Sequence, residues 1–263
     1  MVKKMSLSML YYYNLQEIIK QLPKNITQSM NLSNDNVFNY ATFNDLGNFY
    51  KPGLFRKDKY KLAIKLQDEH FYDFINEAII KFSKTANPDQ LLLIYAMLAH
   101  YILEEEIQKY LSARISKIEP YILLTKKIDK YYTQINDDIN LSKTKIYNLF
   151  PRSFVYKKEM NDLISHPMIK VYSFLESNNY FLRAMKKKKS YYKRCWFPKV
   201  MDLEFLNLEK KPYIIGEQTY TYSLDEIIES ARKKTLKQIS IINEHIFDKK
   251  DEKYNELFKI TKE

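Results

Sequence analysis

The sequence has very little glycine, cysteine and histidine: 3 Gly, 1 Cys and 4 His in 263 residues. A single cysteine excludes an internal disulfide framework, Cys-based zinc ribbons and CxxC redox chemistry. The three glycines, Gly47, Gly53 and Gly216, are scattered, so neither a Walker loop nor a GxGxxG turn occurs. Two common nucleotide-binding motifs are therefore absent, and four histidines limit any histidine-rich metal centre.

Long hydrophobic runs are also missing. The longest apolar run covers residues 91–99, far short of the roughly 20 residues that span a bilayer. At the N-terminus, Lys3 and Lys4 precede a short Tyr-rich stretch without a small-residue cleavage site, so we interpret it as mature protein rather than a signal peptide. Together with the single cysteine, these features predict a reduced, cytoplasmic location.

Positive charge is in excess: 43 Lys and Arg stand against 32 Asp and Glu, a net charge of +11. One segment, residues 186–194, concentrates this charge; it contains Tyr191 and Tyr192, and Trp196 follows it. Basic residues interleaved with aromatic ones suit nucleic acid or an anionic membrane surface; the alternative is a solvated helix end and loop. The candidate anion-binding residues are Lys186, Lys187, Lys188, Lys189, Lys193 and Arg194.

Apolar residues recur at helical spacing almost throughout. Asn87 and Pro88 mark the start of a helix to about residue 111 whose first turns are apolar on every side, so we expect it to be buried. Ser223 and Glu226 form a capping box before a C-terminal helix. Residues 31–57 and 199–222 are interpreted as irregular connections. The pattern predicts an all-α fold, a single domain over 1–263 with seven to nine helices; the others are expected near 11–22, 59–82, 120–134, from 160 onward, and 179–188.

The buried helix carries one pair with metal-binding spacing. His100 and Glu104 are four residues apart, which puts both side chains on one face, and Gln108 follows one turn later. The alternative is a core histidine beside a solvated acidic patch formed by Glu104, Glu105 and Glu106.

Several short motifs follow one another in an order found in one family. The central one is Ala99-His100-Tyr101-Ile102-Leu103-Glu104, followed by Gln108-Lys109-Tyr110-Leu111. The others are Phe38-Asn39-Tyr40-Ala41 with Asn44-Asp45-Leu46, then Glu69-His70, Thr125-Lys126-Lys127-Ile128-Asp129, and Asp202-Leu203-Glu204-Phe205-Leu206-Asn207-Leu208. In this order the chain resembles the bacterial zinc-dependent phospholipase C family.

The resemblance implies an all-helical fold, zinc, and hydrolysis of phospholipid or a related phosphodiester. Carried over by position, the zinc ligands are Asp45, His70, His100, Glu104 and Asp129. Gln108 and Thr125 stand where the family has histidines, and Tyr11, Tyr12 and Tyr13 stand near its N-terminal Thr-His. Gln and Thr are poor ligands for zinc.

Three functions follow. The first is a degenerate scaffold with weak or lost hydrolysis, and the second is a metal-dependent phosphodiesterase with a reduced ligand set. The third is a basic protein that binds nucleic acid or an anionic membrane.

Overall fold

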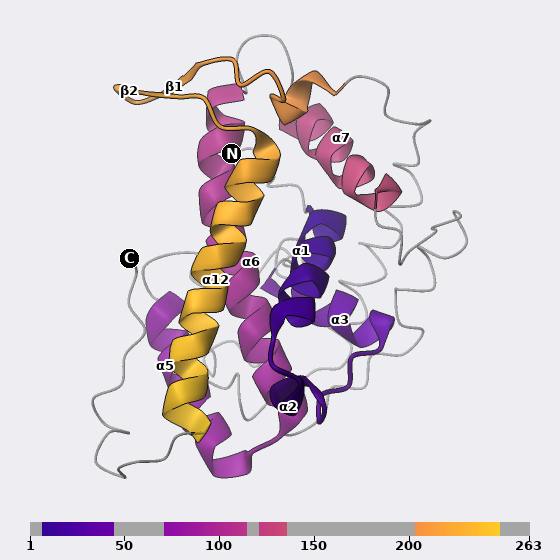
Figure 1. Cartoon of the computed structure of the whole chain (residues 1–263), viewed down its shortest axis with the longest axis vertical. Helices are drawn as coiled ribbons and strands as arrows, with labels where there is room; N and C mark the ends of the chain where they lie inside the picture. Colours follow the sequence, from indigo (N-terminus) through magenta and orange to yellow (C-terminus); the bar gives the residue numbers. More distant parts are fainter. Residues whose placement is uncertain (1–6, 45–70, 115–120, 136–202, 248–263) are drawn as a thin grey trace, which may run out of the picture.

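The computed structural model describes residues 7–44, 71–114, 121–135 and 203–247 (Figure 1). These ranges are mostly helical, so the all-α prediction is confirmed at this level; the phospholipase C fold stays a prediction. Seven α-helices, one 3-10 turn and one hairpin make up the described part: α1 Ser8–Gln21, α2 Lys24–Thr27, α3 Asn34–Ala41, α5 Phe71–Thr85, α6 Pro88–Arg114, α7 Tyr121–Gln134, η4 Glu204–Leu206, β1 Tyr213–Ile215, β2 Gln218–Tyr220 and α12 Leu224–Phe247.

Helix α6 is the central element of this arrangement. The side chains from Leu91 to Ala99 are all buried, as the apolar first turns predicted. Helices α1, α3, α5 and α12 all pack against α6, and Figure 1 shows α12 crossing beside it. Its start is also confirmed, since the Asn87 side chain accepts a hydrogen bond from the Asp89 amide at 2.9 Å. None of the helices in the described ranges is long and apolar enough to cross a membrane.

The predicted capping box at the start of α12 is formed. The Glu226 amide donates to Ser223 Oγ at 3.2 Å, and the Ser223 amide donates to Glu226 Oε2 at 2.9 Å. From there α12 buries Leu224, Ile228 and Ala231 on the face that packs against α6.

Both predicted irregular connections are wrong in part, and their residues 45–57 and 199–202 lie outside the described ranges. Residues 34–41 form α3 because Val37, Phe38 and Ala41 share a buried face against α1 and α6, and this burial outweighs the asparagines that favour a turn. Within 203–222, the chain forms η4 and a two-stranded antiparallel hairpin. Gly216 makes the turn of this hairpin with φ +62, in the left-handed region.

Some of the remaining predicted helices are confirmed, and the others lie outside the described residues. Helix α1 covers most of 11–22 but starts at Ser8, and α7 matches 120–134. Helix α5 confirms the predicted 59–82 helix from Phe71 onward and continues to Thr85, whereas 59–70 lies outside the described residues. The helices predicted from 160 and over 179–188 lie outside the described residues.

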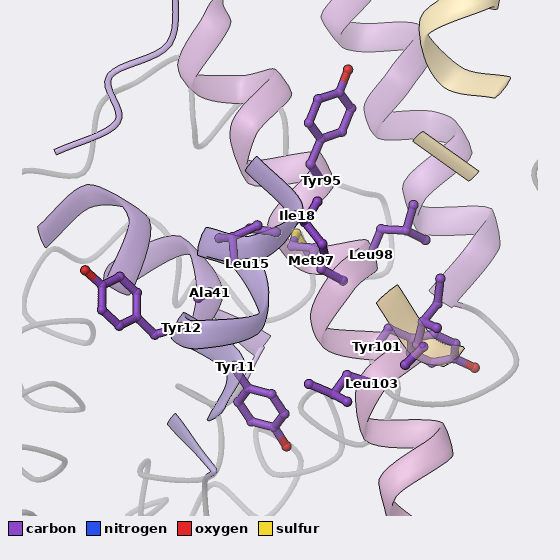
Figure 2. Close-up of a cluster of buried hydrophobic side chains, with 14 of the residues drawn as sticks. Tyr11, Tyr12, Leu15, Ile18, Ala41, Tyr95, Met97, Leu98, Tyr101 and Leu103 are labelled. Carbon is purple, nitrogen blue, oxygen red and sulfur yellow. The ribbon is translucent and has the colours of Figure 1, made fainter. Parts of the chain in front are cut away.

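A continuous hydrophobic core joins α1, α3, α5, α6 and α12. Figure 2 shows Leu15 and Ile18 of α1 beside Met97 of α6, with Tyr11 one turn before Leu15 on α1. Tyr11 therefore enters the interior at the level of α6 where the candidate metal pair lies.

Candidate functional site

The candidate site lies at the middle of α6. Helices α1 and α3 pack against α6, and α7 packs against α1. His100 and Glu104 are one turn apart on α6 and are both buried, at 2% and 8% exposed. The prediction that they share a face is consistent with their contacts, because Tyr11 of α1 reaches both of them.

His100 is held by backbone and by an aromatic ring. Its Nδ1 lies 2.8 Å from the carbonyl oxygen of Ala41, the last residue of α3. A carbonyl only accepts, so Nδ1 carries the proton in this hydrogen bond. The Tyr11 ring lies against the imidazole, with centroids 3.8 Å apart and planes at 34°. Both the tautomer and the orientation of His100 are therefore set by neighbouring helices.

Glu104 receives hydrogen bonds on both carboxylate oxygens. The Tyr11 hydroxyl donates to Oε2, and the Gln108 amide donates to Oε1 at 2.7 Å. Gln108 thus lies on the same face as Glu104, as its spacing predicted. Two neutral donors stabilise a carboxylate that would otherwise be costly to bury.

The interpretation of Glu104, Glu105 and Glu106 as a solvated acidic patch is wrong for Glu104, because this side chain turns inward. Glu106 instead accepts from Lys234 of α12 at 2.8 Å and from Lys109 at 3.3 Å. Burial opposes its ionisation, but these two lysines lower the pKa of Glu106 below its usual value. The acidic run is therefore divided between an interior carboxylate and an ion pair that joins α6 to α12.

Asp129 of α7 caps the start of α1. Its Oδ1 accepts the backbone amides of Met9 at 2.5 Å and Leu10 at 3.1 Å. The residue before the helix, Leu7, supplies no side-chain cap, so the carboxylate comes from 120 residues away. Thr125, one turn before Asp129 on α7, is buried as well.

The structure thus places three of the predicted zinc ligands, His100, Glu104 and Asp129, around the first turns of α1. Among the described residues, no group of three or more His, Cys, Asp or Glu side chains is arranged to hold a metal ion. The predicted ligands Asp45 and His70 lie outside the described ranges, as does the basic segment 186–194. The zinc site and the anion-binding segment therefore stay predictions.

Sequence reasoning missed the residues that complete this cluster. The sequence places Tyr11 only near the position of the family's Thr-His, and the Ala41 carbonyl and the two capped amides are backbone groups without a sequence signal.

Comparison with protein-family models, curated proteins and solved structures finds no match to this chain.

Proposed function

We propose that the protein is a divergent zinc-dependent phospholipase C-like helical scaffold in which phosphodiester hydrolysis is weak or lost. The observation that supports this function best is the pairing of Glu104 with Tyr11 and Gln108. Both oxygens that a zinc ion would use already accept hydrogen bonds from neutral side chains.

The identity of the two donors strengthens the proposal. Gln108 stands where the resemblance places a histidine ligand, and Tyr11 lies in the neighbourhood of the missing N-terminal Thr-His. Two of the departures from the family pattern, Tyr11 and Gln108, are thus side chains that hydrogen-bond Glu104, and a third, Thr125, lies on α7. A donor that replaces a ligand satisfies the carboxylate without an ion, so the helical framework is retained while the chemistry that needs the ion is lost.

The position of Asp129 supports the same function. A carboxylate that ligates zinc needs a lone pair directed at the ion at about 2 Å. Oδ1 of Asp129 is directed at the Met9 and Leu10 amides, where it stabilises the positive end of the α1 dipole. In this role Asp129 joins α7 to α1 and contributes to folding.

The test measures zinc and hydrolysis together. The full-length protein is loaded with excess zinc, dialysed against metal-free buffer and analysed by elemental mass spectrometry, and hydrolysis of bis(p-nitrophenyl) phosphate is measured in parallel. We expect well below one zinc per chain and a rate equal to that of His100→Ala. One zinc per chain that is lost in both His100→Ala and Glu104→Gln would overturn the proposal. The matched control is Tyr95→Phe. Tyr95 also lies on α6, away from the cluster, and this change removes only its hydrogen bond to Asn243 of α12.

A metal-dependent phosphodiesterase with a reduced ligand set is the second candidate, and one observation favours it. Metal-binding histidines commonly donate their second ring nitrogen to a backbone carbonyl, which orients the ring. His100 does this through Nδ1 to Ala41, so Nε2 is its acceptor nitrogen. This candidate requires that added zinc raises hydrolysis and that His100→Ala abolishes the increase, whereas the scaffold function requires no zinc-dependent rate.

A further inference from the structure

We draw no further inference here: the strongest candidate, the side-chain cluster between α1, α7 and the start of α12 in which Tyr13 and Tyr131 lie against Tyr132 and Tyr132 donates to Asp225, carries none, because nothing in the part of the chain that the structure describes shows what covers it.

Discussion

Removal of the Asp129 carboxylate should destabilise the protein by detaching α7 from the start of α1. In Asp129→Ala, the amides of Met9 and Leu10 lose their acceptor in a buried position. A hydrogen bond to a charged group contributes about 1.5 to 3 kcal/mol, and loss of a helix N-cap costs about 0.5 to 2 kcal/mol. The two bonds share one oxygen and are not additive, so we expect a loss of about 2 to 4 kcal/mol in unfolding free energy.

Urea denaturation followed by far-ultraviolet circular dichroism measures this change. A loss of that size lowers the melting temperature of a chain of this length by roughly 5 to 12 °C, since 1 kcal/mol corresponds to about 2 to 4 °C. Asp129→Asn keeps a carbonyl oxygen that can accept the amides but removes the charge, so we expect a loss of only about 1 kcal/mol. Asp73→Ala is the control, because Asp73 is an exposed carboxylate in the first turn of α5.

Two results would refute this reasoning. Equal unfolding midpoints for Asp129→Ala and the wild type would mean that the carboxylate does not cap α1. If Asp129→Asn were as destabilised as Asp129→Ala, and the loss appeared only in zinc-loaded protein, the carboxylate would serve a metal ion instead.

Three further perturbations test separate parts of the structure. Ser223→Ala should cost about 1 kcal/mol by removing the hydroxyl that accepts the Glu226 amide, and urea denaturation measures this loss. Burial and the nearby Asp225 raise the pKa of Tyr132 in the folded state, so the unfolded state loses that proton first and stability falls as pH rises above about 10. Tyr132→Phe should make this decline shallower by about 1.4 kcal/mol per pH unit, and a slope equal to that of the wild type would contradict the assignment. A double-mutant cycle of Tyr11→Phe and Glu104→Gln should give a coupling energy of about 1 to 3 kcal/mol in urea unfolding, and simple additivity would show that the two side chains do not stabilise each other.

The helices with local signals could be predicted from the sequence. Asn87 and Pro88 before an apolar run, and Ser223 with Glu226, define helix starts within four residues, and both starts occur as predicted. The sequence predicts a start for α1 at residue 11, three residues late, because the cap is Asp129, 120 residues away from Met9. Helix α3 was missed because its asparagines favour turns and only burial against α1 and α6 makes it a helix.

The same distinction applies to the candidate site: contacts along α6 could be predicted from the sequence, and contacts from other helices could not. The shared face of His100, Glu104 and Gln108 follows from helical spacing, and the structure shows the Gln108–Glu104 hydrogen bond. The partners from other helices, the Tyr11 hydroxyl and the Ala41 carbonyl, are 93 and 59 residues away and have no local signal. Residue spacing identifies which side chains share a face but does not show what lies opposite them.

The groups that face His100 and Glu104 from other helices determine the chemistry of this site. A histidine and a glutamate one turn apart are equally suited to an ion or to hydrogen-bond donors. In this protein Tyr11 both donates to Glu104 and packs its ring on His100, so one side chain engages both members of the pair. A ligand pair engaged in this way is a stable part of the core without an ion, because the buried carboxylate has its donors and the imidazole has its carbonyl partner. Under the proposed function, Tyr11 and Gln108 would weaken zinc binding, and the same two side chains stabilise the fold through their hydrogen bonds to Glu104.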